Sequence, residues 1–281
     1  MIVLLLVLLC FFAFLIIFCL IERQFIIIRR DDITLEKLPH SFDGLKILQI
    51  SDLHHRSFGK DQARIIKRAK ALSPDIIVIT GDLISRDMRD FSSAARFCGS
   101  LSRTAPVLFS IGNHELDLPE KVRDTYLSAL KNVGVHLLLN SSYTLSRGDA
   151  SIDFTGLSLD MSVYHGDDFS YKNLDPYSLR KIEASIGVRK RCTVLLAHNP
   201  LIFDAYAAWN ADLILSGHVH GGVVRLPFIG GILSPERRFF PSYTRGLYCK
   251  DSSKLYVSAG LGKLRLFNPP EICLITLRSP K

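Results

Sequence analysis

The chain has 281 residues, 48% of them hydrophobic, and a formal net charge of +8. This length allows one large domain, or two small ones, with a sizeable buried core. The six cysteines show no C-x-x-C spacing typical of metal sites, and no dense basic run or nucleic-acid motif accompanies the positive charge. Nucleic acid is therefore not the expected partner. The basic excess instead suits anionic lipid headgroups, or serves solubility alone.

The N-terminal segment 1–21, MIVLLLVLLCFFAFLIIFCLI, contains no charged side chain. About 20 apolar residues suffice to cross the hydrocarbon core of a bilayer. A cleaved signal peptide would need a basic start and small residues before the cleavage site. A core helix would not be apolar on every face. We therefore predict an uncleaved, single-pass transmembrane anchor at 1–21.

The charges beyond this anchor predict its orientation. Nothing basic precedes the apolar run, whereas four basic residues follow it, namely Arg23, Arg29, Arg30 and Lys37. The positive-inside rule then places the remainder of the chain in the cytoplasm.

A connector at 22–44 leads into apolar runs that alternate with helix-like segments. Strands are expected at 45–52, 75–82 and 106–115, and helices at 60–72, 88–101 and 119–132. This βαβαβ order predicts strands that share one sheet with helices packed against it. The second half is richer in strands, and Asp175 followed by Pro176 reads as the start of another helix. No linker interrupts 45–281, which we predict to be one domain.

Polar residues recur where the apolar strands end. Five of the nine histidines fall at such ends, and the full set is Asp52, His54, Asp82, Asn113, His114, His198, His218 and His220. Ligands of open α/β sheets bind beyond the carboxyl ends of the strands, so these residues should converge on one site. Imidazole and carboxylate ligands suit Mn, Fe and Zn. Glycines at 81, 112, 217 and 221 allow the tight turns that bring such side chains inward.

The ordered set D-x-H, G-D, G-N-H, H and G-H-x-H, from about Leu45 onward, resembles that of the calcineurin-like metallophosphoesterases. The tail SGHVHGGVVRLPFIGG…YTRGLY…KLYVSAGLG…FNPPEICLITL is similar to that of a membrane-anchored bacterial branch of the family. The resemblance implies a four-layer αββα sandwich. It departs from the branch at Val223, where glutamine is usual, and at Ala259, where arginine is expected, so it does not carry substrate specificity over.

The resemblance also implies a role for each residue. Asp52, His54 and His220 would hold a first divalent ion, whereas Asn113, His198 and His218 would hold a second, and Asp82 would bridge the two. A bridging hydroxide would attack phosphorus in line with the leaving oxygen, and the catalytic His114 would assist that oxygen as a general acid. The two imidazoles of G-H-V-H would thus serve two different ions.

Other residues leave alternatives open. His55, His40 and His136 are expected to be surface or structural residues. The loop 161–171, which includes Tyr164, is either a lid over the site or a solvated loop. The segment 235–240 either contacts a phosphate, an acyl chain or the membrane, or tucks Phe239 and Phe240 into the core.

The sequence therefore predicts a metal-dependent phosphoester hydrolase acting at the membrane surface on a diester or pyrophosphate with a lipid part, such as a UDP-linked acylated glucosamine. One alternative is a soluble phosphomonoesterase or nucleotidase. Another is a membrane-tethered binding protein that uses the fold without catalysis.

Overall fold

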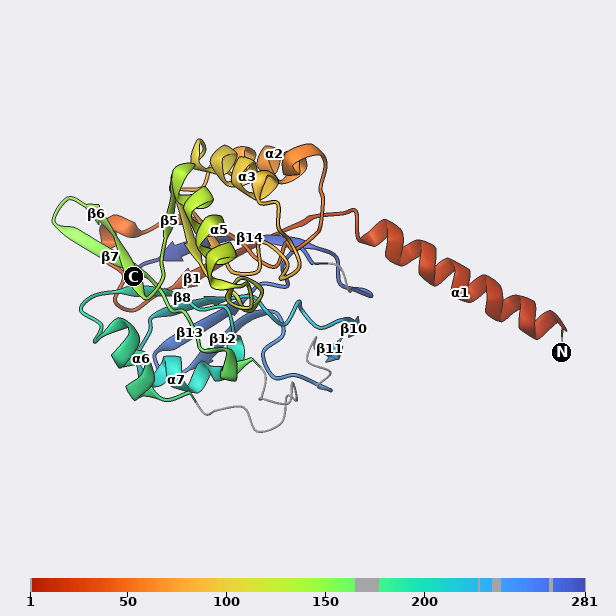
Figure 1. The fold of residues 1–281 in the computed structure, drawn as a ribbon. Helices are drawn as coiled ribbons and strands as arrows, with labels where there is room; N and C mark the ends of the chain where they lie inside the picture. Colours follow the sequence, from red (N-terminus) through yellow and green to blue (C-terminus); the bar gives the residue numbers. More distant parts are fainter. Residues whose placement is uncertain (1, 165–176, 227, 234–238, 263–264, 281) are drawn as a thin grey trace.

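A computed structural model describes residues 2–164, 177–226, 228–233, 239–262 and 265–280. Helix α1 (Ile2–Glu22) projects away from the rest of the molecule, and none of its residues is buried (Figure 1). It is long and apolar enough to cross a membrane. The other elements form a single layered body.

Two six-stranded sheets make the inner layers. The first has the order β1 (Ile27–Thr34), β14 (Glu271–Arg278), β2 (Lys46–Ile50), β3 (Ile76–Thr80), β4 (Val107–Ser110) and β5 (Val135–Leu137). The second has the order β12 (Gly246–Lys250), β13 (Ser253–Val257), β9 (Leu213–Ser216), β8 (Thr193–Leu196), β7 (Ala150–Gly156) and β6 (Ser141–Arg147). A separate two-stranded hairpin pairs β10 (Val224–Leu226) with β11 (Gly230–Leu233).

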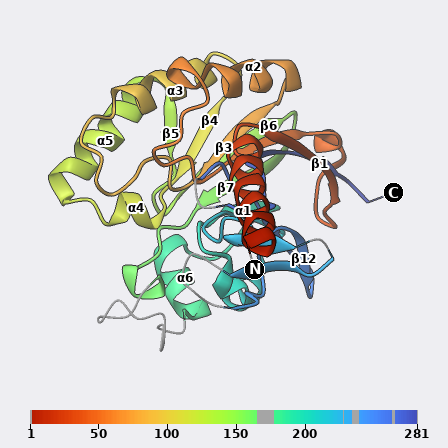
Figure 2. The same cartoon turned by 90° about the vertical axis from the view of Figure 1, so that its right-hand side faces the viewer.

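Helices cover the outer face of each sheet (Figures 1 and 2). The first sheet carries α2 (Ala63–Leu72), α3 (Ser92–Ser102) and α5 (Glu120–Asn132), and the second carries α6 (Leu179–Ile186) and α7 (Phe203–Ala208). The short elements are α4 (Asn113–Leu116) and the 3₁₀ turns η1 (His40–Phe42), η2 (Lys60–Gln62), η3 (Met161–Val163) and η4 (Pro200–Ile202). This is the four-layer αββα sandwich that the family resemblance implied, and that prediction is confirmed.

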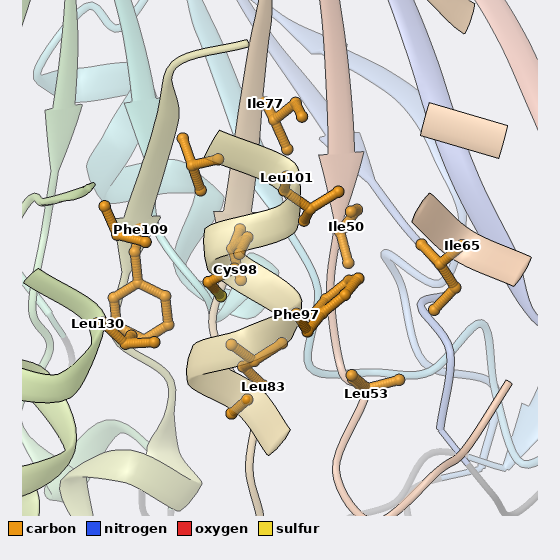
Figure 3. Packing of buried hydrophobic residues seen from close by; sticks show 14 of the residues in the cluster. Ile50, Leu53, Ile65, Ile77, Leu83, Phe97, Cys98, Leu101, Phe109 and Leu130 are labelled. Carbon is orange, nitrogen blue, oxygen red and sulfur yellow. The ribbon is translucent and has the colours of Figure 1, made fainter. Parts of the chain in front are cut away.

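Each layer boundary is an apolar core. Figure 3 shows α3 placing Phe97, Cys98 and Leu101 against Ile50 of β2 and Ile77 of β3. Between the two sheets, residues of β2, β3 and β14 pack on residues of β8, β9 and β13. The central strands β3, β4, β8 and β9 are buried along their whole length, which explains why their sequences are continuous apolar runs.

The expected βαβαβ order is confirmed, since β2, β3 and β4 are neighbours and parallel. One local expectation differs. The predicted connector 22–44 contains β1, which pairs in parallel with β14 at the sheet edge. Helix α6 begins at Leu179, where the Ser178 side chain accepts a hydrogen bond from the backbone of Lys181. Asp175 and Pro176, where the sequence predicts a helix start, lie outside the described residues.

Candidate active site and metal centre

The predicted site residues follow the carboxyl ends of β2, β3, β4, β8 and β9, where Asn113 and His114 begin the short helix α4 and the others lie in loops. Five of them have backbones in the left-handed region, with φ of 55° at Asp52, 52° at His54, 53° at Asp82, 70° at His218 and 53° at His220. Such conformations cost about 1–3 kcal/mol each and persist where the surroundings impose them, as they do at functional sites. These turns direct the side chains into the space between the strand ends.

Asp52, His54 and His220 form a first group. The Nε2 atom of His220 lies 3.5 Å from Oδ1 of Asp52 and 3.4 Å from Nε2 of His54. One nitrogen or oxygen atom from each residue falls within 4.8 Å of the others, which is the spacing that a shared cation requires.

Asp82 lies at the centre of the site. Its Oδ2 atom is 3.2 Å from Nε2 of His198, 3.8 Å from Nε2 of His54 and 3.9 Å from Nε2 of His114. The carboxylate therefore faces the first group on one side and His198 on the other.

Asn113 and His218 extend the site beyond His198. The Oδ1 atom of Asn113 lies 3.0 Å from Nδ1 of His218, and the His218 ring is 5.1 Å from the His198 ring between centroids. The backbone amide of His218 also donates to Oδ1 of Asp52 at 3.1 Å. All eight residues predicted from the strand ends are thus within one cluster.

Glycines are required where these loops touch one another. A Cβ atom on Gly217 would come within 2.4 Å of Oδ2 of Asp52, and one on Gly112 within 2.3 Å of Oδ1 of Asp82. Real Cβ atoms do not approach other atoms so closely, so the glycines of G-H-x-H and G-N-H allow close packing of the loops.

The donor set fits divalent cations. The Nδ1 atom of His198 donates to the carbonyl oxygen of Thr80 at 2.6 Å, which leaves its buried Nε2 facing Asp82 with no hydrogen-bond partner. Burial alone would lower the pKa of His198, but the charges of Asp82 and Asp52 raise that pKa to about 10. The negative charge of two buried carboxylates therefore outweighs desolvation, and the site favours a positive charge within it.

Residues 45–222 match the family model described as calcineurin-like phosphoesterase. The chain belongs to the calcineurin-like phosphoesterase family. It is accordingly a metal-dependent phosphoester hydrolase, as the sequence predicted.

Similar proteins from several bacteria support this assignment. The phosphoesterase is 31% identical to the uncharacterized metallophosphoesterase YkuE of Bacillus subtilis, over 86% of this chain and 82% of that protein. It is 27% identical to the UDP-2,3-diacylglucosamine pyrophosphatase LpxG of Chlamydia muridarum, over 85% and 86% of the two chains. It is 28% identical to the phosphodiesterase YaeI of Escherichia coli, over 83% and 82%.

The fold also matches solved structures. Phosphopantetheinyl hydrolase PptH of Mycobacterium tuberculosis superposes with a TM-score of 0.50 at 16% identity, over 77% of this chain and 89% of that one. A 5′-nucleotidase precursor of Thermus thermophilus also gives a TM-score of 0.50, at 15% identity, over 78% and 49%. Identities this low establish the fold alone.

Glu115, to which the sequence analysis gave no role, lies between two loops of the site. Its fully buried carboxylate accepts backbone hydrogen bonds from Asp82 and Gly112, both at 2.9 Å, and from Ile84 at 3.2 Å. Glu115 therefore ties the loop after β3 to the loop after β4. The one sequence signal was a glutamate three residues after Gly112, in the position of a helix capping box.

The sequence analysis likewise gave no role to Arg86, which lies beside His114. Its side chain lies 3.4 Å from Nε2 of His114 and pairs with Asp117 at 2.9 Å. Burial lowers the pKa of His114 to about 4, against the opposing effect of Asp82, and the positive charge of Arg86 also lowers it. Nothing in the local sequence of Arg86 indicated this position.

The other residues that the sequence analysis singled out lie outside the cluster or at its edge. His55 is partly exposed and pairs with Asp87 at 2.7 Å, as expected of a surface residue. His40 contacts Ser279, and His136 packs on Tyr143. Tyr164 is buried with its ring 5.0 Å from that of His218, whereas residues 165–171 of the proposed lid lie outside the described residues.

Phe239 and Phe240 are exposed, so the alternative that tucked them into the core is wrong. Residues 235–238 of the same segment are outside the described part of the chain.

Proposed function

We propose that the phosphoesterase hydrolyses a phosphodiester or pyrophosphate bond of a lipid-linked substrate at a membrane surface, using two divalent ions. The first ion would be held by Asp52, His54 and His220, the second by Asn113, His198 and His218, and both by Asp82. The observation that carries this proposal is the position of Oδ2 of Asp82, within 3.8 Å of imidazole nitrogens from both ligand groups. The ligands suit Mn, Fe or Zn.

When bound, such a pair of ions polarises the phosphoryl oxygens and lowers the pKa of a water molecule to near neutrality. The chain itself supplies His114, whose Nε2 faces this site 3.9 Å from Asp82. Burial lowers the pKa of this imidazole and so favours its neutral form. An anionic phosphoester favours the protonated form, which can then donate a proton to the leaving oxygen. Arg86 adds positive charge beside it.

The membrane and lipid parts of the proposal rest on α1 and on the relatives. Helix α1 has no buried residue and is followed by basic residues, which supports a membrane anchor with the domain in the cytoplasm. LpxG, a relative over most of both chains, is named for a substrate with two acyl groups and a pyrophosphate. An anchored enzyme meets such a substrate in the plane of the bilayer.

The test uses the full chain in detergent micelles, stripped of metal and reloaded with Mn²⁺, Fe²⁺ or Zn²⁺. Hydrolysis of bis-p-nitrophenyl phosphate, p-nitrophenyl phosphate and UDP-2,3-diacylglucosamine is then compared. We expect metal-dependent turnover of the diester and the lipid-linked pyrophosphate, with two ions bound per chain. Turnover of the monoester alone would instead support the soluble phosphomonoesterase or nucleotidase alternative. Two bound ions without turnover of any substrate would leave a binding role.

A further inference from the structure

The hairpin β10–β11 and residues 239–240, which lie against β11, carry exposed apolar side chains. Phe228 is fully exposed, and Ile229, Phe239 and Phe240 are at least 61% exposed. Outside α1, the described residues include eight large hydrophobic side chains that are largely exposed, and six of them are these four together with Phe25 and Ile27. A soluble surface rarely groups apolar side chains in this way unless they contact a partner or a membrane.

The hairpin is connected to α1 through a series of contacts. The ring of Phe18 in α1 lies 5.4 Å from that of Phe267 between centroids. The neighbouring Leu266 pairs with Val224 of β10, and β10 pairs with β11. The backbone of Phe240 then donates to Ile232 of β11 at 2.8 Å. Figure 1 shows β10 and β11 at the end of the domain from which α1 departs.

This connection sets the depth of the hairpin relative to a membrane that α1 spans. Phe18 is four residues before the end of α1 at Glu22, which corresponds to about 6 Å along the helix axis. A residue in contact with Phe18 therefore lies near the boundary between headgroups and acyl chains. Val224 is one strand spacing from Leu266, about 5 Å. The hairpin therefore begins close to the end of α1 that leaves the membrane.

Basic residues surround the same end of the domain. A groove of about 420 Å³ between β1 and α2 is lined by Arg30, Arg64, Lys67 and Arg68 together with apolar residues that include Ile28 and Leu72. The Arg64 side chain donates to the carbonyl oxygen of Gln24 at 2.6 Å, only two residues beyond α1. Cations at the level of the headgroups suit a surface that contains anionic lipids.

We propose that this end of the phosphoesterase is a lipid-binding face, in which Phe228, Ile229, Phe239 and Phe240 enter the interface of an anionic bilayer. The proposal rests on the proposed anchoring by α1. The hairpin gives the domain a second attachment point, and two points fix its rotation about the axis of α1. Aromatic and branched aliphatic side chains lie in the interface in this manner on peripheral membrane proteins.

Insertion of the hairpin would also position the predicted metal centre. Gly222 follows the predicted ligand His220 by two residues, and a Cβ atom on Gly222 would come within 2.8 Å of the Cα atom of Gly231 in β11. Strand β11 of the hairpin therefore packs directly on the loop that carries His218 and His220. Inserting the tip would hold the site at the membrane surface, where a lipid-linked phosphoester enters it.

The test measures the depth of single tryptophans in the full chain, reconstituted into vesicles that contain phosphatidylglycerol. The chain has one tryptophan, the buried Trp209, whose signal is subtracted using the unsubstituted protein. The probes are Phe228→Trp and Phe240→Trp. Phe12→Trp, within α1, reports insertion of the anchor. Val188→Trp is a matched control, since Val188 is 71% exposed but lies between α6 and β8. Quenching by brominated lipid is recorded for each.

We expect both hairpin tryptophans to lose emission to brominated lipid and to shift to shorter wavelength, while Val188→Trp does neither. Quenching of Phe12→Trp without quenching at 228 and 240 would overturn the lipid-binding face and leave the anchor intact. Absence of quenching at every position, including that of Phe12→Trp, would overturn the anchor as well. Efficient cross-linking between copies at position 240, without quenching, would assign the face to a second copy of the chain and also overturn the proposal.

Discussion

The metal-binding loops and the hairpin end of the domain are stabilised in opposite ways. In the loops, the two carboxylates of Asp52 and Asp82 and the imidazole of His198 are buried against one another, and the loop glycines approach neighbouring atoms closely. The hairpin has two strands of three and four residues, a shifted register after Val224 and exposed aromatic side chains. Short two-stranded hairpins have little stability of their own in water.

This difference indicates what each region requires from outside the chain. The loops that carry the predicted ligands are positioned by the sandwich itself, and their side chains already lie close enough to share a cation. The hairpin leaves apolar side chains exposed that nothing in the described part of the chain covers, so it offers a surface to a partner or a membrane. Substitutions in the loops of the site should therefore have larger effects than substitutions in the hairpin.

Asp82→Asn should have the largest effect. The substitution keeps the size of the side chain but removes the negative charge shared by both ligand groups. We expect fewer than two ions per chain and a loss of turnover of about 10³-fold or more. Metal content by mass spectrometry and hydrolysis of bis-p-nitrophenyl phosphate give the two readouts.

The control for this change is Asp204→Asn, because Asp204 is an exposed carboxylate that pairs with Lys250 away from the site. It should retain both metal and activity. A variant Asp82→Asn with two ions and nearly normal turnover would show that Asp82 does not bridge them.

His114→Ala should come next. It should keep both ions but lower turnover by about 10²-fold, the usual contribution of a general acid. The loss should be greater with an alkyl leaving group than with p-nitrophenolate, since the latter leaves without a proton. His55→Ala, the adjacent surface histidine, serves as the control. Equal losses for both leaving groups would contradict the role as an acid.

The sequence predicted that these residues cluster because the signal is local. Each predicted ligand lies shortly after an apolar strand, and the carboxyl ends of parallel strands meet at one edge of a sheet. Asp52 and Asp82, at the ends of β2 and β3, are the clearest example, since those strands pair side by side. The αββα arrangement came from the family resemblance, because strand order alone does not specify how two sheets pack.

The features that escaped prediction depend on tertiary contacts. Strand β1 is largely exposed at a sheet edge and contains charged residues, so it lacks an apolar pattern. The importance of Glu115 lies in which backbone amides it meets, and two of the three belong to a loop about 30 residues away in sequence. Phe228 and Phe240 are likewise separated in sequence, and only the fold shows that both are exposed on one hairpin region.

Glu115→Gln should have a smaller effect than either change above. An amide accepts through only one oxygen, so it cannot satisfy the backbone amides of Asp82, Ile84 and Gly112 together. We expect metal affinity to fall about 10–100-fold and the free energy of unfolding to fall by about 1–3 kcal/mol. Metal titration and thermal unfolding measure these two quantities. Glu183→Gln, on the exposed face of α6, is the control, and equal behaviour of both variants would contradict a positioning role.

The double variant Phe228→Asp with Phe240→Asp should have the smallest effect and the most selective one. Carboxylates at these positions oppose insertion into an anionic interface, while α1 still anchors the chain. We expect turnover of UDP-2,3-diacylglucosamine in vesicles to fall about tenfold or less, and turnover of bis-p-nitrophenyl phosphate to stay unchanged. Val188→Asp should alter neither. An equal loss on both substrates would mean that the hairpin supports the packing of His218 and His220 rather than the approach of the lipid, since a fault in the metal loops affects every phosphoester alike.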